Sequence, residues 1–211
     1  GFAVNSRMPE AKILPLSHAQ RVATGRNDRP GAPNSLVFSF RLAQRPASPG
    51  DLVLSGPHGH SFDEDCLPGL RLDDGPNPEH NVFGHLQWLL GYARWEVAAQ
   101  VLSCAGDGPL ARMRIDLGLH AEKAYAFRLG LASNPWQTPD PNLWTIEYAG
   151  ESSLPFEGFS LWTFRAHSLR PTTPAAGDGA ARVANPVVLR FRTHSEVPAD
   201  PLGEGAGGLR R

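Results

Sequence analysis

Residues 110–131 (LARMRIDLGLHAEKAYAFRLGL) alternate between apolar and polar side chains, and this pattern limits the fold more than any other feature. The apolar positions in its two halves are Met113, Ile115, Leu117 and Leu119, then Tyr125, Phe127, Leu129 and Leu131. A period of two indicates β-strands with one buried face, whereas strands of parallel sheets are apolar on both faces. We therefore predict an antiparallel strand pair here whose inward side chains share one interior, and an antiparallel β domain built around it.

Shorter segments elsewhere show the same alternation, and turn-rich stretches separate them. The further strands are predicted at residues 36–42, 51–55, 95–104, 144–148, 158–164 and 187–191. Long loops are expected at residues 24–35, 56–80 and 133–142, because Gly, Pro, Asn and Asp concentrate there. A short helix is predicted at Asn81–Trp95, where apolar residues have helical spacing. Residues 171–184 are expected to form a linker, and the tail after residue 200 to be disordered.

The composition excludes several classes of partner. A net charge of −1 over 211 residues gives no basic surface for nucleic acid or for an anionic membrane. The sequence has no apolar run of about 18 residues, so we expect no membrane insertion by this segment.

The two cysteines, Cys66 and Cys104, are 38 residues apart. In an oxidising compartment they would pair, and closing a loop of that length is worth about 4 kcal/mol. The alternative is a pair of buried thiols. We predict the disulfide, and no zinc site built from cysteines, because no C-x-x-C spacing occurs.

One block recurs in the chain: residues 34–41 (NSLVFSFR) and 185–192 (NPVVLRFR) share four residues at an offset of 151. The dipeptide Gly-Phe at residues 1–2 recurs at 158–159, at an offset of 157. These matches predict a tandem array with a period of about 150 residues. Residues 1–7 would end one module, 8–167 would form a complete one, and 168–211 would be a linker and the start of the next. Chance similarity between two β-strands is the alternative.

Five segments within about residues 25–165 resemble the tandem immunoglobulin-like modules of very large surface-associated proteins of unicellular algae and other protists. They are RPGAPNSLVFSF, PGDLVL, CAGDG, KAYAFRLGLASNP and PNLWTIEYAG. The resemblance implies an all-β fold, an antiparallel immunoglobulin-like β-sandwich with long loops and at most one short helix. It also implies a non-enzymatic structural or adhesive repeat at the cell surface or outside the cell. Its partners would be neighbouring modules, glycans or other surface proteins, and no catalytic residue can be transferred.

A candidate metal site lies in the loop at residues 56–80. His58 and His60, two residues apart in an extended segment, point the same way and could share zinc or copper with Asp63 or Asp65. Calcium is the alternative cofactor, held by the loop carboxylates Asp63, Glu64, Asp65, Asp73 and Asp74. A solvated acidic loop without a metal would show the same residues, and no cofactor is our main expectation.

Motifs for catalysis are missing from the sequence. No G-x-S-x-G occurs, since residues 158–162 (GFSLW) lack the second glycine, and no phosphate-binding glycine motif is present. We therefore predict no enzyme activity.

Tryptophans supply the candidate for ligand binding. Trp95 and Trp144 fall in strand-like segments and are expected in the core. Trp136 lies in a proline-rich loop, where an exposed indole could stack on sugar rings. A carbohydrate-binding module on the same fold is the alternative function.

Overall fold

The computed structural model describes residues 6–72, 91–96, 98–162, 164–171 and 187–193. The chain divides into two compact units between Leu161 and Trp162. The predicted module limits at residues 7 and 167 stay predictions, although Ser6–Arg7 already pairs within the first unit. No helix in the described part of the chain is long and apolar enough to cross a membrane.

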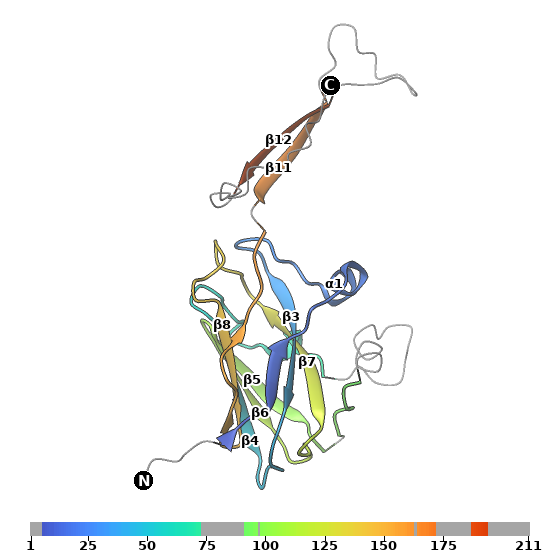
Figure 1. Ribbon diagram of the computed structural model, residues 1–211, viewed down its shortest axis with the longest axis vertical. Coiled ribbons are helices and arrows are strands. Elements are labelled where there is room, and N and C mark those ends of the chain that lie inside the picture. The colour runs from blue at the N-terminus through green and yellow to red at the C-terminus, as the bar shows by residue number, and fades with distance from the viewer. Residues whose placement is uncertain (1–5, 73–90, 97, 163, 172–186, 194–211) are drawn as a thin grey trace, which may run out of the picture. The chain divides into compact units, whose positions relative to one another are not determined.

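The first unit contains two β-sheets that face each other (Figure 1). The larger sheet has the strand order β1-β9-β8-β4-β6-β5, and β10 adds to β8. Its strands are β1 Ser6–Arg7, β4 Gly50–Ser55, β5 Val101–Asp107, β6 Leu110–Ile115, β8 Leu143–Tyr148, β9 Glu151–Ser152 and β10 Phe156–Glu157. The smaller sheet, β2-β3-β7, consists of β2 Glu10–Ile13, β3 Asn34–Arg41 and β7 Ala124–Leu131. All neighbours are antiparallel except β1 and β9. The all-β prediction is confirmed.

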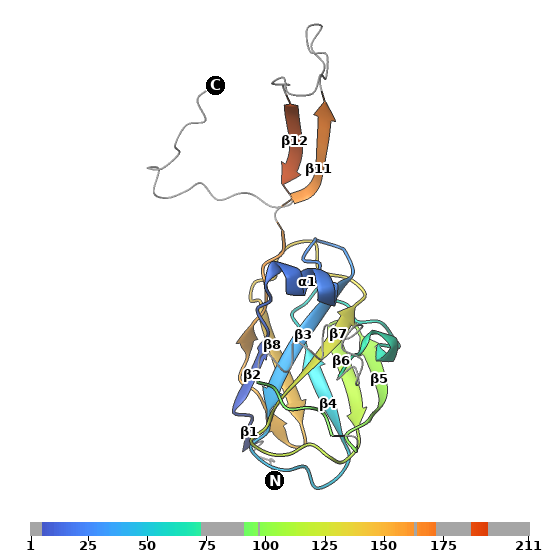
Figure 2. The same ribbon diagram turned by 90° about the vertical axis from the view of Figure 1, so that its right-hand side faces the viewer.

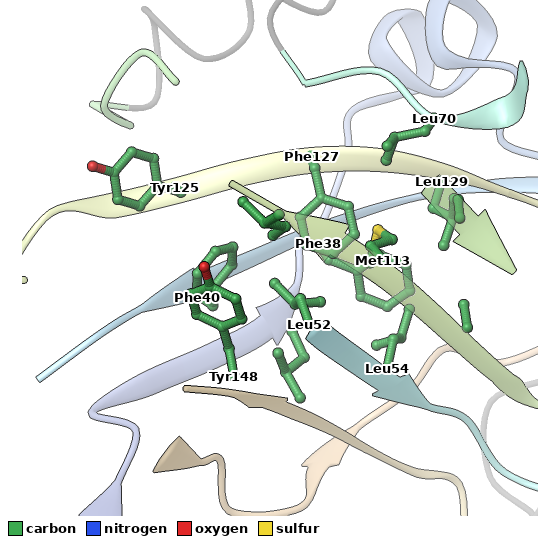
Figure 3. Close-up of a cluster of buried hydrophobic side chains, with 14 of the residues drawn as sticks. Phe38, Phe40, Leu52, Leu54, Leu70, Met113, Tyr125, Phe127, Leu129 and Tyr148 are labelled. Carbon is green, nitrogen blue, oxygen red and sulfur yellow. The ribbon is translucent and has the colours of Figure 1, made fainter. Parts of the chain in front are cut away.

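Aromatic and aliphatic side chains from both sheets fill the space between them (Figure 3). The rings of Phe38 on β3 and Phe127 on β7 stack with their centroids 5.4 Å apart. Trp144 on β8 approaches Phe38 from the opposite sheet, with 5.5 Å between the ring centroids. Leu52 and Met113 are also fully buried there. Alternation places these side chains inward, because consecutive residues of a strand point to opposite faces.

The two alternating halves of residues 110–131 both become strands, but they do not pair with each other. β6 lies between β4 and β5 in the larger sheet, whereas β7 pairs with β3 in the smaller one. The predicted strand pair is therefore wrong, and the predicted shared interior is confirmed. β6 ends at Ile115, so Leu117, which we placed on the buried side, is 43% exposed.

The chain crosses from the smaller to the larger sheet between β3 and β4. The buried carboxylate of Glu151 accepts hydrogen bonds from the backbone N–H groups of Ala43 (2.8 Å) and Gln44 (2.7 Å). Anchoring the connection in this way satisfies a carboxylate that would be costly to bury alone.

A short helix, α1 (His18–Thr24), follows β2 at one end of the first unit (Figure 2). Ser17 and Gln20 form a capping box at its start, and Gly25 ends it with a φ of 75°. We predicted the helix at Asn81–Trp95 instead. Residues 81–90 lie outside the described residues, and residues 91–95 are not helical. Apolar spacing could not find α1, since its most apolar side chain, Val22, is 70% exposed.

The predicted disulfide between Cys66 and Cys104 is confirmed. It attaches the loop after β4, which includes the 3₁₀ turn η1 (Leu67–Gly69), to strand β5. The same loop also packs closely against β5 at Gly106. Only glycine allows this approach, because a Cβ atom there would lie only 2.2 Å from the carbonyl oxygen of Asp63.

The second unit contains the antiparallel pair β11 (Phe164–Pro171) and β12 (Val187–Thr193). The strand predicted at residues 187–191 is confirmed. The strand predicted at residues 158–164 is wrong, since residues 158–162 are irregular and lie between β10 and β11. The predicted linker at residues 171–184 and the tail after residue 200 lie almost entirely outside the described residues.

Candidate functional site

A pocket of about 270 Å³ lies in the first unit beside α1. Residues 13–16, which follow β2, form one wall, and Gly158 and Phe159, which follow β10, form another. Arg21 of α1 and Arg26 just after it supply the charged groups. We call this site the arginine pocket.

A buried carboxylate holds both arginines. Asp28 is 1% exposed, and its two oxygens accept hydrogen bonds from Arg21 Nη2 and Arg26 Nε. Asn34 at the start of β3 donates a third hydrogen bond to Asp28, at 3.2 Å, and bonds Asn134 at 3.1 Å. The loop between α1 and β3 is thereby fixed to the end of β7, and the cluster of two guanidiniums and one carboxylate carries a net charge of +1.

Arg26 is enclosed even though it is charged. Its side chain is 4% exposed, and its guanidinium carbon lies 4.1 Å from the centroid of the Phe159 ring. Burial lowers the pKa of Arg26, and the hydrogen bond from its guanidinium to Asp28 opposes that shift. Arginine nevertheless stays protonated in proteins, so this is a positive charge stacked on an aromatic face.

His60 lies behind the arginine pocket and is buried, with 2% exposure. Its ring packs edge-on against Trp144 (4.8 Å between centroids) and Phe159 (5.6 Å). Burial lowers the pKa of His60 to about 4; the charge of Arg26 adds to that shift and the Pro57 carbonyl opposes it. The imidazole is therefore neutral at neutral pH, and Nδ1, 3.2 Å from Pro57 O, carries the proton.

Two further buried polar atoms lie next to Gly158. A Cβ atom at this position would be 2.2 Å from Asn142 Oδ1 and 2.6 Å from Trp144 Nε1, so only glycine fits. Neither atom has a hydrogen-bond partner among the described residues, and nor does His60 Nε2. Buried polar groups are normally paired, so these three atoms near Gly158 and Trp144 are exceptions, as are Ser39 Oγ and Tyr148 Oη elsewhere in the described residues.

The buried neutral His60 predicts acid sensitivity. Its folded pKa of about 4 is below the unfolded value of 6.5, so the unfolded chain binds more protons between these pH values. The contribution of neutral His60 to the free energy of unfolding is fully present above pH 6.5. It decreases by about 3 kcal/mol as the pH drops towards 4. Urea unfolding from pH 7 to pH 4 measures this loss.

His60→Gln should remove most of this pH dependence, whereas His58→Gln, which changes an exposed histidine in the same loop, should leave it unchanged. An unaltered slope in His60→Gln would assign the acid sensitivity to other groups.

The residues proposed as metal ligands differ in their exposure to solvent. His58, Asp63 and Asp65 are exposed, whereas His60 is buried among aromatic rings. Glu64 is exposed too, and Asp73 and Asp74 lie outside the described residues. Among the described residues no three His, Cys, Asp or Glu side chains are grouped to hold a metal ion. The zinc, copper and calcium sites stay predictions from the sequence.

The tryptophans lie where the sequence placed them. Trp95 (6% exposed) and Trp144 (0%) are in the core, while Trp136 is 61% exposed. One side of the Trp136 indole covers Gly31, where a Cβ atom would lie 2.8 Å from Trp136 Cη2. The exposed fraction leaves indole surface for a ligand.

The arginine pocket was not predicted from the sequence. Arg21, Arg26 and Asp28 lie in a segment that reads as an ordinary polar loop, with no spacing typical of a known site. The available signal was the Ser17–Gln20 capping box, which indicates a helix start and would have placed Arg21 on a helix.

Comparison with known proteins identifies no family. No family model and no curated protein matches the chain. One solved structure, a DUF4466 family protein from Parabacteroides merdae ATCC 43184, is similar at 8% sequence identity with a TM-score of 0.36. The match covers 78% of this chain and 47% of that protein, so the chain spans about half its length.

Proposed function

We propose that the chain belongs to a tandem array of immunoglobulin-like β-sandwich modules, with a non-enzymatic structural or adhesive role in a larger secreted or cell-surface protein. The observation that carries the proposal is that both copies of the repeated block form a strand that pairs antiparallel with the strand before it, one in each unit.

In the first unit β2 pairs with β3, with Glu10 opposite Arg41 and Ile13 opposite Phe38. In the second unit β11 pairs with β12, with Ala166 opposite Arg192 and Leu169 opposite Leu189. Strands β3 and β12 contain the two copies of the repeated block, so their residue numbers differ by the offset of 151.

The pairing then relates the first strands by an offset of 156, from Glu10 to Ala166. This value is within one residue of the offset of 157 between the two Gly-Phe dipeptides, and it aligns Pro15 with Pro171. A connection five residues shorter accounts for the difference between 156 and 151. Any antiparallel pair would give one constant offset, so the support for a second copy comes from the nearness of 156 to 157 and from the match of Pro15 with Pro171.

Two other features bear on the proposal. Disulfides persist mainly in oxidising compartments, so the Cys66–Cys104 bond supports a secreted or surface location. Two facing sheets with Trp144 between them support the immunoglobulin-like class. The disulfide differs from the usual one in that class, since it joins a loop to an edge strand rather than one sheet to the other.

Sequencing the parent transcript in both directions tests the array. We expect further copies of the Asn-x-x-Val-x-x-Phe-Arg block about 150 residues apart, because each module repeats the same strand. We also expect a signal peptide. A parent with a single copy of the module, or with no export signal, would contradict the proposal.

Carbohydrate binding is the second candidate, and the exposure of Trp136 favours it. Stacking on a sugar should quench tryptophan fluorescence during a glycan titration of the full chain, and Trp136→Ala should abolish the response. Trp162→Ala, which removes another exposed indole, is the matched control and should keep it. A response that persists in Trp136→Ala would exclude Trp136 as the sugar platform.

A further inference from the structure

We propose that the arginine pocket binds a small organic monocarboxylate with an apolar body. The inference concerns a site distinct from Trp136 and does not depend on the proposed array.

The pocket has more hydrogen-bond donors than acceptors. Each guanidinium carries five N–H donors. Within the described part of the chain the Arg21 and Arg26 guanidiniums each donate to one acceptor, Asp28. Both oxygens of Asp28 are already occupied, and Asn34 binds one of them as well. Counting the described residues alone, one positive charge is therefore left without a counterion beside the pocket.

The donors are held in place before any ligand arrives. Arg26 is clamped between the Asp28 carboxylate and the Phe159 ring, with its side chain 4% exposed. Arg21 is fixed to the same carboxylate but remains 38% exposed. A planar guanidinium held in one orientation matches a carboxylate well, because little freedom is lost on binding.

Charge and shape then select the ligand. The cluster's net charge of +1 is neutralised by a monoanion, whereas a dianion would leave an excess negative charge against buried surface. The wall at residues 13–16 is made of Ile, Leu and Pro, which gives an organic body apolar surface to cover. A volume of about 270 Å³ lies below the usual range for drug-sized ligands and fits a small molecule.

Calorimetric titration of the full chain with phenylacetate tests the proposal. We expect saturable binding, and binding at least about tenfold weaker for phenylacetamide, which has the same body without the charge. Acetate, which has the charge without the body, and inorganic phosphate should also bind at least about tenfold more weakly. These four probes need no variant and so do not depend on how a mutant folds.

Variants then locate the site. Arg21→Gln should weaken phenylacetate binding about tenfold, and Leu16→Ser should weaken it through the apolar wall. Arg112→Gln, which changes an exposed arginine paired with Asp51, is the matched control and should bind normally. The proposal is overturned by absent phenylacetate saturation up to about 10 mM, by equal binding of phenylacetamide or acetate, by tighter binding of phosphate, or by unchanged affinity in Arg21→Gln.

Discussion

Replacing Cys66 and Cys104 together by alanine should lower the free energy of unfolding by about 4 kcal/mol. The disulfide closes a loop across 38 residues, so breaking it returns conformational freedom mainly to the unfolded chain. Both cysteines are buried, and alanine leaves no unpaired polar group in their place. Urea unfolding of the full chain with and without reductant measures the effect.

The double variant and the reduced parent protein should unfold at nearly the same urea concentration, and reductant should have no effect on the variant. A parent protein whose midpoint is unchanged by reductant, with its thiols shown to be free, would mean that the disulfide contributes little. That outcome would also weaken the argument for a secreted location.

Asp28→Asn should lower the free energy of unfolding by about 3–5 kcal/mol, because it leaves the buried guanidinium of Arg26 without a counterion. The chain offers a matched control. Asp51 is also paired with two arginines, Arg112 and Arg114, but this cluster lies at the surface. Asp51→Asn makes the same chemical change, and we expect a loss of at most about 1 kcal/mol.

Urea unfolding of the two variants side by side compares the free-energy cost of removing a buried carboxylate charge with the cost of removing an exposed one. Raising the salt concentration should shrink the small Asp51 effect and leave most of the Asp28 effect, because buried charges are poorly screened. Equal losses in both variants would show that Arg26 is better solvated than its 4% exposure suggests.

The positions of most strands could be predicted from the sequence, because an apolar period of two is a local property of the chain. β4, β6 and β8 show the expected alternation of buried and less buried residues, whereas β3 is buried at all five positions from 36 to 40 and β7 at three consecutive positions, 125 to 127. The predicted exposure of the outward side chains was wrong where other residues cover the outer face of a strand. Ala126 lies between the inward positions Tyr125 and Phe127 of β7, so alternation predicts that it faces outward, yet it is buried with Leu14 and Val37. No local pattern reports what covers the outer face.

The cysteine pairing and the burial of the core tryptophans could also be predicted from the sequence. Two cysteines allow a single pairing, and large aromatic residues in alternating segments belong to the buried face. The arginine pocket could not be predicted, because its members come from α1, the next loop, and the segment after β10. They meet through contacts between residues distant in sequence, such as the Arg26 guanidinium on the Phe159 ring and the hydrogen bond from Asn142 to the Phe159 carbonyl.

The amino-acid sequence by itself thus determined that the chain forms antiparallel strands, which side of most strands is buried, and which cysteines join. The tertiary structure decided which strands pair, since β6 and β7 follow each other in the chain yet enter different sheets. It also decided that Arg26, Asp28 and His60 are buried at one end of the first unit. The physical reason is that alternation reflects the geometry of a single strand, whereas pairing and burial depend on contacts between residues distant in sequence.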